Sequence, residues 1–476
     1  MTLSVQAERR RTMKIDGVEI GGITCDSREV KKGYAFVAVK GSRRDGSSFA
    51  GEALKRGASL IISEKGAGGG SVFGKARRVV VKDARKFLAE ASAEFYGRPS
   101  EKMKVAGVTG TNGKTTVTYL IEAIAKRSGE DCGVIGTVNY RFSGKELRAK
   151  NTTPGPVELQ RLLAGMLRRR IKYCAMEVSS HALVQQRVRG ISFSQAIFTN
   201  LTQDHLDYHK SLNNYFSAKA RLFRLLRDTG TAIVNNDDKY GRRIKKLLSR
   251  RPVTYGIKNR STVMARDICF GAKGSKFTLV APGIESSIRT PMIGLYNIYN
   301  ILAAVCWGIS EKISFNHIKS AIEEFKCVPG RLERAGDNIF IDYAHTPDAL
   351  SNVIKALRPL IAGRIIVVFG CGGERDRSKR PKMGRIATEL ADYAVITTDN
   401  PRSEDPLRIT AEICRGARRG NYCVLVDRFE AIRKAVSLKG RNDCLVIAGK
   451  GHEDYQALKE KVVHFSDREA VRKCLR

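Results

Sequence analysis

A glycine-rich turn with the sequence TGTNGKTT joins an apolar stretch to a helix-forming stretch. Gly110 and Gly113 let the backbone approach an anion closely, and a helix that starts near Lys114 would point free N–H groups at that anion. Lys114 would bring a positive charge to the β- and γ-phosphates of ATP, and Thr115 would offer a hydroxyl to a magnesium ion. Val108 stands where the usual GxxxxGK[ST] pattern has its first glycine. We interpret the turn as a shorter ATP phosphate loop, with a purely structural turn as the alternative.

Two later segments place metal-binding side chains directly after predicted strands. Glu177 could give a hard carboxylate oxygen to a magnesium ion that bridges ATP phosphates. His205 and His209 follow the next apolar run and lie four residues apart, a spacing also found in zinc sites. The helical HExxH context is missing, and an upstream phosphate loop favours a hard ion. The sequence therefore favours magnesium at Glu177 and His205, with a hydrogen-bonded loop histidine as the alternative.

Composition narrows the class of protein. The chain has 476 residues, of which 42% are hydrophobic, and a chain of this length folds as about three domains. No apolar run is long enough to span a membrane, and residues 1–21 lack the apolar stretch of an export signal, so we expect a cytoplasmic protein without membrane insertion. The 11 cysteines include no C-x-x-C pair, which argues against a disulfide framework and a thiolate zinc site.

The formal net charge of +37 is the largest anomaly in the composition, and it would suit a protein that binds nucleic acid. The basic clusters, however, are spread along the chain at residues 9–11, 168–170, 242–251 and 415–419, without interleaved aromatic residues for base stacking. We therefore expect a solvated basic surface that attracts small anionic substrates, and no specific nucleic-acid partner.

Strand-like apolar runs alternate with helical stretches along the whole chain. The predicted strands are residues 34–39, 60–62, 78–81, 173–178, 195–200, 339–342, 365–369, 393–397 and 445–448, and the predicted helices include 84–96 and 212–226. Several of the strands are continuously apolar and end in polar residues, which is typical of parallel sheets with a site at their carboxyl ends.

These elements predict an α/β protein of three domains. Residues 1–100 would form a small N-terminal α/β domain. Residues 101–329 would form a central P-loop ATPase-like domain with a parallel sheet, and residues 330–476 a C-terminal Rossmann-like domain.

The order of the motifs along the chain resembles that of the Mur ligases over nearly its whole length. The motifs are TGTNGKTT at 109–116, EVSSH at 177–181, NLTxDHLDYH at 200–209, YFxAK at 215–219, PGRLE at 329–333 and DYAHTPD at 342–348. GCGGERD at 370–376, DNPR at 399–402 and GKGHEDYQ at 449–456 are similar to third-domain signatures of the family's diaminopimelate-adding members.

The resemblance implies an ATP-dependent, ADP-forming amide ligase of peptidoglycan precursor synthesis, and hence of cell wall formation, cell shape and cell division. ATP would convert the D-glutamate γ-carboxylate of a UDP-muramoyl dipeptide into an acyl phosphate, which the amine of meso-diaminopimelate would attack. Two Mg²⁺ ions and Lys114 would offset the accumulating negative charge. The ATP-binding residues so implied are Gly110, Thr111, Asn112, Gly113, Lys114, Thr115, Thr116, Asn297, Asn300, Arg331, Asp342 and His345.

The implied catalytic residues are Lys114, Glu177, His205 and Lys219. In this family the lysine that matches Lys219 is carbamylated to N6-carboxylysine, which turns a cation into an oxygen ligand. The implied metal ligands are then Thr115, Glu177, His205 and the Lys219 carbamate. By its spacing alone, Lys219 lies on an amphipathic helix where a lysine usually faces solvent, so the modification depends on the resemblance.

The same resemblance implies that the N-terminal domain binds the UDP-sugar and the C-terminal domain the amino acid, and it assigns these substrates to side chains. The UDP-muramoyl dipeptide would contact Ser27, Asn151, Thr152, Thr153, Ser179, Gln185 and Arg187. Diaminopimelate would contact Arg375, Asp399, Asn400, Pro401, Arg402, Gly449 and Glu453. Arg402 suits the distal carboxylate and Glu453 the distal ammonium, whereas Glu374 departs from the aspartate usual at its position.

Three alternatives stay open on the sequence. A lysine-adding ligase of the same family is the nearest, although Arg402 argues against it because lysine has no distal carboxylate. A folylpolyglutamate-type ligase would have no obvious use for DNPR or GKGHE, and a basic P-loop ATPase that acts on nucleic acid would use the positive charge. We expect a monomer.

Overall fold

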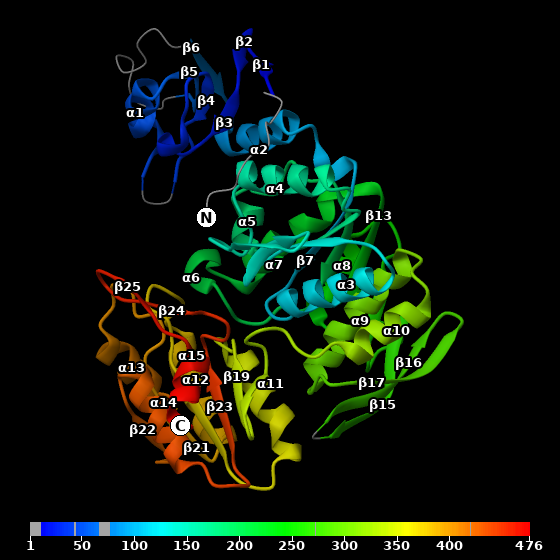
Figure 1. Ribbon diagram of the computed structural model, residues 1–476, viewed down its shortest axis with the longest axis vertical. Coiled ribbons are helices and arrows are strands. Elements are labelled where there is room, and N and C mark those ends of the chain that lie inside the picture. The colour runs from blue at the N-terminus through cyan, green and yellow to red at the C-terminus, as the bar shows by residue number, and fades with distance from the viewer. Residues whose placement is uncertain (1–10, 42–43, 66–76, 272, 419) are drawn as a thin grey trace. The chain divides into compact units, whose positions relative to one another are not determined.

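The computed structural model describes residues 11–41, 44–65, 77–271, 273–418 and 420–476, whose helices and strands are labelled in Figure 1. The chain divides into two compact units, each built from separate stretches of sequence. The first unit consists of Met1–Gly107, Asp131–Gln195 and Arg221–Gly230, and the second of Val108–Glu130, Ala196–Ala220 and Thr231–Arg476.

A four-stranded parallel sheet in the order β3-β4-β5-β6 forms one part of the first unit. Along β4, Ala35 and Val37 pack in the cluster that contains α2, whereas Phe36 packs in the cluster that contains α1. This alternation places apolar side chains on both faces of the strand, and a helix covers each face. The elements are β1 Met13–Ile15, β2 Val18–Ile20, β3 Gly22–Thr24, β4 Tyr34–Val37, α1 Ala50–Lys55, β5 Ala58–Glu64, β6 Arg77–Val81 and α2 Ala84–Phe95.

The rest of the first unit carries a strand that ends in a candidate metal ligand. β11 pairs in parallel with β8, and β8, β9 and β10 follow one another as an antiparallel run. β11 is buried over its whole length and ends at Glu177, shortly before α5 begins at Ser180. The bounds are β8 Cys132–Ile135, β9 Asn139–Phe142, β10 Lys145–Arg148, α4 Pro156–Arg168, β11 Tyr173–Glu177 and α5 Ser180–Val184.

Three strands begin in the first unit and end in the second, namely β7 Lys104–Thr109, β12 Phe193–Phe198 and β13 Leu226–Asn235. β7 and β12 run side by side. In the first unit Val105 N–H donates to Ser194 Oγ over 3.2 Å, and in the second Thr199 N–H donates to Thr109 O over 3.0 Å. The loops that follow these two strands therefore leave the same edge together, as at the carboxyl ends of a parallel sheet.

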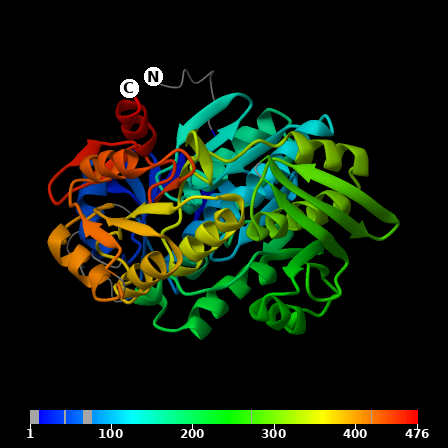
Figure 2. The same cartoon turned by 90° about the horizontal axis from the view of Figure 1, so that it is seen from below.

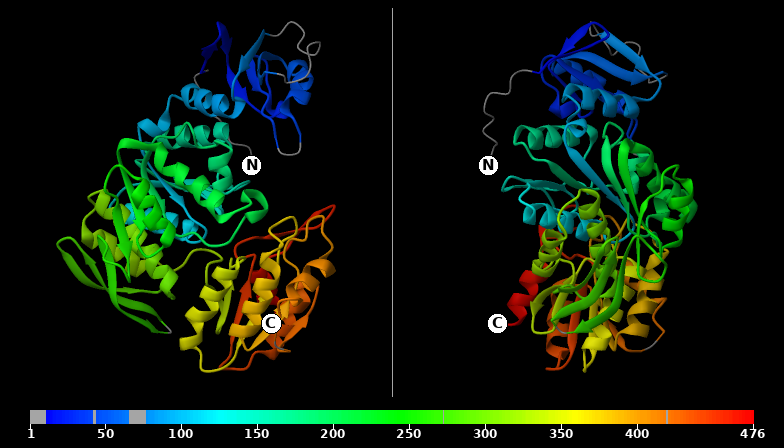
Figure 3. Two further views of the ribbon diagram at one scale, coloured as in Figure 1. Left: turned by 180° about the vertical axis from the view of Figure 1, so that it is seen from behind. Right: turned by 90° about the vertical axis from the view of Figure 1, so that its right-hand side faces the viewer.

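In the second unit, α3 packs against α9 and α10. The end of β13 pairs in parallel with β14, β14 pairs in parallel with β15, and β15, β16 and β17 form an antiparallel meander (Figure 3). The bounds are α3 Lys114–Arg127, α6 Leu206–His209, α7 Leu212–Ala220, α8 Lys239–Leu247, β14 Val253–Gly256, β15 Val263–Gly271, β16 Gly274–Ala281, β17 Ile284–Thr290, α9 Leu295–Ser310 and α10 Phe315–Glu324.

The C-terminal part of the second unit is a six-stranded sheet in the order β18-β19-β23-β20-β21-β22, parallel except for β18. Helices α11, α12 and α13 contribute to the core on one face, and α14 and α15 to the core on the other (Figures 1 and 2). The bounds are β18 Glu333–Gly336, β19 Ile339–Asp342, α11 Pro347–Leu357, β20 Ile365–Phe369, α12 Lys379–Leu390, β21 Tyr393–Ile396, α13 Pro406–Cys414, β22 Tyr422–Val424, α14 Arg428–Leu438, β23 Cys444–Ala448, β24 Tyr455–Ala457, β25 Val462–His464 and α15 Asp467–Cys474.

A fully buried ion pair fixes the carboxyl ends of two strands in this sheet. Arg428 binds both carboxylate oxygens of Asp467 at 2.8 Å, and both side chains have 0% exposure. The same guanidinium donates to Thr398 O, just after β21, and to Ala448 O, at the end of β23, each over 3.1 Å. The two loops that follow these strands are therefore held at a fixed spacing.

The predicted strands are present within a few residues of their predicted bounds, and the predicted helix at 84–96 is α2. The helix predicted over 212–226 is wrong in length. α7 ends at Ala220, residues 221–225 form a 3₁₀ turn, and Leu226 begins β13. Leu222 is fully buried and packs beside Gly107 of β7. This contact outweighs the helical spacing of the apolar residues, so the helix ends early. No helix in the described ranges is long and apolar enough to cross a membrane.

We predict that Asp467→Ala lowers the free energy of unfolding by about 3–5 kcal/mol, because it leaves the buried Arg428 charge without a carboxylate. The matched control is Arg433→Ala on α14, the helix that carries Arg428, since Arg433 pairs with Glu430 at the surface. Loss of an exposed pair costs about 1 kcal/mol or less. Urea unfolding followed by circular dichroism measures both, and similar losses in the two variants would contradict the role given to the buried pair.

Candidate active site

The phosphate loop follows β7, and α3 begins at Lys114 as predicted. Gly113 has φ +89°, and a Cβ on it would lie 2.3 Å from Asn300 Oδ1. A Cβ on Gly110 would lie 1.8 Å from Thr199 Oγ1. Both positions therefore require glycine. Lys114 Nζ donates to Gly110 O over 3.0 Å and to Thr111 O over 2.9 Å, so its ammonium group lies over the turn of the loop.

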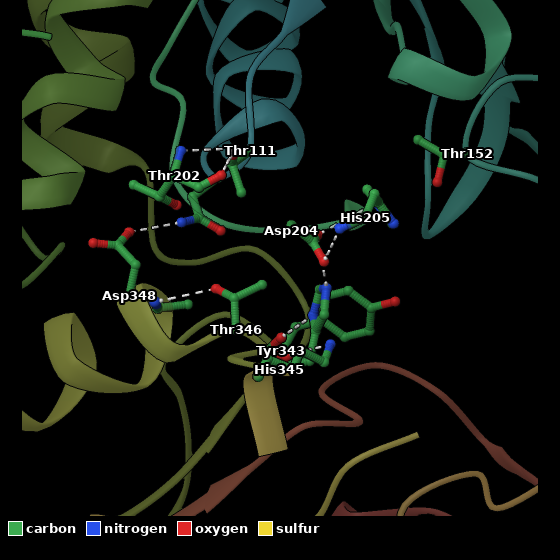
Figure 4. A network of polar contacts seen from close by, with 12 residues as sticks. Thr111, Thr152, Thr202, Asp204, His205, Tyr343, His345, Thr346 and Asp348 are labelled. Atoms are coloured by element: carbon green, nitrogen blue, oxygen red, sulfur yellow. Dashed lines mark hydrogen bonds and ion pairs between the residues drawn. The ribbon is translucent and has the colours of Figure 1, made fainter. Parts of the chain in front are cut away.

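Residues that follow β12 hold this loop in place. Asn112 N–H donates to Asn200 Oδ1 over 3.0 Å, and Thr199 Oγ1 donates to Asn112 O over 2.6 Å. Thr111 Oγ1 accepts from Thr202 N–H over 3.0 Å (Figure 4). The loop is thus shaped by side chains of its neighbouring strand before any phosphate is bound.

A contact from the C-terminal sheet reaches the same loop. Asn112 Nδ2 donates to Asp348 Oδ2 over 2.9 Å, and Asp348 lies in the first turn of α11 (Figure 4). Thr346 caps this helix by accepting from Ala349 N–H over 3.2 Å. Asp348 therefore joins the start of α11 to the phosphate loop, a contact that the spacing of the motifs did not reveal.

A buried carboxylate lies beside the loop, close to two histidines and a lysine. Asp204 Oδ2 is 3.3 Å from His205 Nε2 and 3.9 Å from His345 Nε2 (Figure 4). Burial acts to raise the pKa of Asp204, but His205, Lys379 and His345 outweigh it and hold the pKa well below its usual range. Asp204 is therefore ionised at neutral pH. It belongs to the NLTxDH motif, yet the sequence did not identify it as a site residue.

His345, unlike Asp204, is held in its uncharged form. Desolvation and the Lys379 ammonium group lower the pKa of His345 to about 4, so this imidazole is neutral at pH 7. Its Nδ1 lies 2.8 Å from Tyr343 O, which makes Nδ1 the protonated nitrogen and leaves Nε2 as an acceptor. Lys379 Nζ donates to His345 O over 2.8 Å and holds this segment against α12.

Lys219 is buried, and the expectation from its helical spacing that it faces solvent is wrong. Its exposure is 1%, and its Nζ donates to Gly110 O over 2.7 Å and lies 4.5 Å from the centre of the Tyr215 ring. Burial and the nearby Lys114 charge hold the pKa of Lys219 well below its usual range, although Asp204 acts in the opposite direction. α7 therefore presents Lys219 to the phosphate loop because its inner face packs there.

The residues predicted to complete the ATP site surround the start of α3. Arg331 Nη2 donates to Thr115 Oγ1 over 3.1 Å, and Asn300 Nδ2 donates to Asn297 Oδ1 over 3.2 Å. Asp342 Oδ2 accepts from Leu332 N–H over 2.6 Å. A pocket opens beside these side chains, and its lining includes Thr116, Met292, Ile293, Asn297, Val328 and Arg331.

Two arginines define the predicted amino-acid site in the C-terminal sheet. Arg402 adopts a left-handed backbone with φ +55°, and its Nη1 donates to Gly373 O over 2.6 Å. Burial and the neighbouring Arg375 charge lower the pKa of Arg402. A Cβ on Gly373 would lie 1.9 Å from Pro401 O, so the GCGGERD loop packs directly on the DNPR loop. Arg402 and Arg375 are thus close enough for their charges to interact, and Asp399 and Glu453 act in the opposite direction on the pKa of Arg402.

An acidic side chain lies in the neighbouring loop. Glu453 Oε2 accepts from Asn400 Nδ2 over 2.8 Å and is 3.3 Å from Lys450 Nζ. Burial and Asp399 raise the pKa of Glu453, whereas Lys450 acts to lower it. Gly449 has φ +114°, and a Cβ on it would lie 2.7 Å from Asp399 Oδ2. The DNPR and GKGHE loops therefore meet at a mixed acidic and basic site, and Lys450 was not predicted.

In the first unit, Glu177 is held at the end of β11. Its Oε1 accepts from Thr137 N–H over 2.8 Å, and its Oε2 accepts from Thr137 Oγ1 over 3.0 Å. Thr137 Oγ1 also lies 3.1 Å from Thr152 Oγ1. Glu177 has 1% exposure, and a Cβ on Gly136 would lie 2.4 Å from its Oε1. Thr137 fixes the orientation of the predicted metal ligand, and no sequence motif pointed to this residue.

Predicted dipeptide contacts gather around the same strand end. Thr153 Oγ1 donates to Glu177 O over 2.8 Å and accepts from Ser179 N–H over 3.0 Å. Arg187 donates to Gln185 Oε1 through Nε over 2.9 Å and to Thr153 O through Nη1 over 2.9 Å. The structure thus joins Thr153, Ser179, Gln185 and Arg187 in one polar network.

The remaining predicted contacts of this substrate lie nearby in the first unit. Asn151 O accepts from Tyr140 OH over 2.6 Å, and Ser27 Oγ donates to Glu52 Oε2 over 2.7 Å. Burial raises the pKa of the Cys25 thiol, and Arg187 acts against this, which places the guanidinium near the loop that carries Ser27. Glu177 and these contacts belong to the first unit, whereas the phosphate loop, His205, Lys219 and the amino-acid loops belong to the second.

The fold and these side chains define a nucleotide-binding α/β protein with a phosphate loop at the carboxyl edge of parallel strands. Three family models match the chain: the Mur ligase family, catalytic domain at residues 19–96, the Mur ligase middle domain at 108–308, and the Mur ligase, glutamate ligase domain at 330–451. The chain belongs to the Mur ligase family. The predicted α/β fold class and the family resemblance are confirmed.

Similar proteins extend over nearly the full chain. A UDP-N-acetylmuramoyl-L-alanyl-D-glutamate--2,6-diaminopimelate ligase of Clostridium tetani (strain Massachusetts / E88) is 41% identical and covers 96% of this chain and 95% of its own. A ligase of the same name from Gloeobacter violaceus is 43% identical over 98% of this chain and 95% of its own. A solved structure with that name is 31% identical, has a TM-score of 0.68 and covers 97% of each chain.

A more distant structure shares the fold alone. The MurF ligase from Thermotoga maritima, solved in complex with ADP, is 18% identical, has a TM-score of 0.65 and covers 95% of this chain and 96% of its own.

We predict that Asp342→Asn changes the pH dependence of stability. Burial, opposed by Arg331, raises the pKa of Asp342 from 3.8 to about 6. The folded chain then holds this proton at a pH where the unfolded chain has lost it, so folding stability falls as pH rises through this window. The asparagine variant lacks that loss, and its stability relative to the natural chain should grow by about 2 kcal/mol between pH 4 and pH 7.

Urea unfolding at several pH values measures the difference, with the exposed Asp337→Asn as the matched control. A stability difference for Asp342→Asn that stays constant with pH would contradict the assignment.

Proposed function

We propose that this protein joins meso-diaminopimelate to UDP-N-acetylmuramoyl-L-alanyl-D-glutamate, with ATP converted to ADP and phosphate. The pairing of Arg402 and Arg375 beside Glu453 carries the choice of amino acid. Diaminopimelate has a distal carboxylate and a distal ammonium group, which these charges complement. The relatives named as diaminopimelate ligases, at 41–43% identity over nearly the whole chain, support the same choice.

The lysine-adding alternative fits the site less well. Lysine has no carboxylate at its far end, so it would bring no anion of its own to the half-buried Arg402 and the neighbouring Arg375. A nucleic-acid ATPase is not supported either, because the three family models that match the chain all describe Mur ligases.

The phosphate loop would bind ATP through groups that this chain places around one anion site. Lys114 lies over the loop, Thr115 starts α3, and Arg331 reaches Thr115 from the C-terminal side. Arg331 Nε is buried and has no hydrogen-bond acceptor among the described residues. An unsatisfied buried donor is costly, and a phosphate oxygen would satisfy it. The pocket beside Asn297 combines apolar side chains such as Met292 and Ile293 with polar ones, a mixture that suits the base of the nucleotide.

ATP would then activate the carboxylate for amide formation. A carboxylate is a poor acyl donor, so its oxygen would attack the γ-phosphorus of ATP, and ADP would leave. The resulting acyl phosphate carries a good leaving group. The amine would add to the acyl carbon, phosphate would leave, and the amine would lose a proton. Lys114 and Arg331 would stabilise the negative charge that develops on the transferring phosphoryl group.

Magnesium fits the oxygen-rich donors of this site, and it would act as a Lewis acid on the phosphate oxygens. In the described ranges, no three His, Cys, Asp or Glu side chains converge on one point. Phosphate oxygens would therefore have to supply part of each coordination shell. We assign the protein ligands to Thr115, Glu177, His205 and Lys219 as its carbamate, which agrees with the family resemblance.

The buried Lys219 amine is suited to this modification. Only a neutral amine attacks carbon dioxide, and burial beside Lys114 favours the neutral form. The amine nitrogen would form a bond to the carbon of CO₂ and release one proton to solvent. The product carries a negative charge where the ammonium form would repel a metal ion and Lys114.

The muramoyl dipeptide would bind the network of the first unit. Thr152, Thr153 and Ser179 offer hydroxyl groups near Glu177, and Arg187 offers a guanidinium group for a carboxylate. We place the domain boundaries at residues 1–100, 101–329 and 330–476, which lie close to the ends of the matched family models. Action as a monomer in the cytoplasm stays a prediction.

We predict that Lys219→Ala lowers kcat at least about 100-fold, because the variant loses a metal ligand at the phosphoryl transfer site. Added bicarbonate should not restore it, since no amine remains, but a short carboxylic acid such as formate should partly replace the missing carboxylate. Phosphate release in the presence of all substrates measures both effects. The control is Lys246→Ala on the exposed face of α8, and unchanged activity in Lys219→Ala would refute the assignment.

We predict that Arg402→Ala reduces the preference for meso-diaminopimelate over lysine, measured as the ratio of kcat/KM values, by about 100-fold or more, because a charged bidentate contact is lost. Arg402→Lys keeps the charge but not the fork and should recover only part of the preference. The exposed Arg408→Ala on α13 is the control. Efficient coupling of lysine by the natural chain would overturn the choice of amino acid itself.

A further inference from the structure

Tyr343 lies between the nucleotide side and the amino-acid side of the second unit, and no role has been given to it above. It follows Asp342 at the end of β19, within the DYAHTPD motif. Its ring centre lies 4.7 Å from that of His345 and 5.2 Å from that of His452. It therefore contacts both the loop after β19 and the GKGHE loop after β23 (Figure 4 shows Tyr343 with His345).

On the nucleotide side, Tyr343 contacts Arg331. The guanidinium carbon of Arg331 lies 4.6 Å from the centre of the Tyr343 ring, a cation–π distance. Arg331 Nη2 also donates to Thr115 Oγ1 at the start of α3. Arg331 therefore connects the phosphate loop to the face of this ring. An anion that binds Arg331 would, through this contact, also influence the position of the ring.

On the amino-acid side, the phenol oxygen of Tyr343 donates to Glu453 Oε1 over 3.4 Å. The other carboxylate oxygen of Glu453 accepts from Asn400 Nδ2 over 2.8 Å and lies near Lys450. Burial and the Glu453 charge raise the pKa of Tyr343, so its hydroxyl stays protonated and remains a donor at neutral pH. The two oxygens of Glu453 are thus oriented from two different loops.

Close backbone packing restricts the ring. Gly451 has φ +54°, and a Cβ on it would lie 2.8 Å from Tyr343 Cβ. A Cβ on Gly330 would lie 2.1 Å from His452 N, so the segment that carries Arg331 packs directly on the GKGHE loop. With glycine at both contacts, three chain segments meet around Tyr343 with little space for it to move.

We propose that Tyr343 is a positioning residue that couples the nucleotide subsite to the amino-acid subsite, through Arg331 on its face and Glu453 at its hydroxyl. Arg331, once seated on phosphate, holds the ring, and the ring holds Glu453 in the orientation that receives the distal ammonium group. This inference depends on the proposed function, because that function assigns the ammonium group to Glu453. It adds a connection between the two subsites that neither of them has alone.

Two substitutions of Tyr343 distinguish its contact with Glu453 from its contact with Arg331. Tyr343→Phe keeps the ring and removes the donor to Glu453, so KM for meso-diaminopimelate should rise about tenfold while KM for ATP changes less than about twofold. Tyr343→Leu also removes the ring face, so both KM values should rise. In the Arg331→Lys background, Tyr343→Phe should raise KM for diaminopimelate by less than it does in the natural chain, since the connection is already weakened.

The measurements use the full chain with ATP, the muramoyl dipeptide nucleotide and meso-diaminopimelate, and Tyr393→Phe on β21 is the matched control. Thermal unfolding of each variant checks folding, and if Tyr343→Leu does not fold, Tyr343→Phe alone decides. Unchanged KM for diaminopimelate in Tyr343→Phe, a change in kcat alone, or independent effects in the double variant would overturn the inference. Absence of ligation by the natural chain would instead overturn the proposed function.

Discussion

The crowding of positive charge around one short loop is the constraint on which the rest of this structure depends. Lys114 and Lys219 both donate to Gly110 O, and Arg331 reaches Thr115 a few residues further on. Like charges at such distances in a partly desolvated site repel strongly, and an anion at the centre relieves the repulsion. Burial together with repulsion from Lys114 explains why Lys219 favours its neutral form.

The fold supports this loop from several directions. The strand end after β12 supplies Thr199 and Asn200, and α11 supplies Asp348 from the C-terminal sheet. A turn that rich in glycine would otherwise sample many conformations, since glycine restricts the backbone least. The hydrogen bonds from neighbouring elements therefore replace the rigidity that the loop sequence itself lacks, and they present its N–H groups before the nucleotide arrives.

Much of the architecture was predictable from local pattern. Runs such as residues 365–369 are apolar at every position, so they could only be strands buried on both faces, and the turn before Lys114 marked its own helix start. The family resemblance followed from the order of the motifs along the chain, and recognising this order requires no knowledge of tertiary contacts. The predicted helix over 212–226 failed because burial of Leu222 beside Gly107, a contact distant in sequence, overrode the helical period.

The missed site residues share one property, which is that their partners lie far away in the chain. Asp348 meets Asn112 across 236 positions, and Tyr343 meets Glu453 across 110. Lys219 was predicted as a site residue by the family resemblance alone, because amphipathic spacing tells which residues share a face but not what that face packs against. Thr137, which orients Glu177, lies in no recognisable motif. Side-chain identity in a motif was readable from the sequence, whereas the residues that orient it were not.

The buried Arg428 has a consequence for substrate size. Because it ties Thr398 O to Ala448 O, the DNPR and GKGHE loops start from anchors that cannot move apart or together without breaking a fully desolvated pair. The distance between the charged groups of Arg402 and Glu453 is then fixed by these anchors. We therefore expect a molecule one methylene shorter or longer than the right one to reach only one of the two charges, so the core of the sheet would set the length that this site accepts.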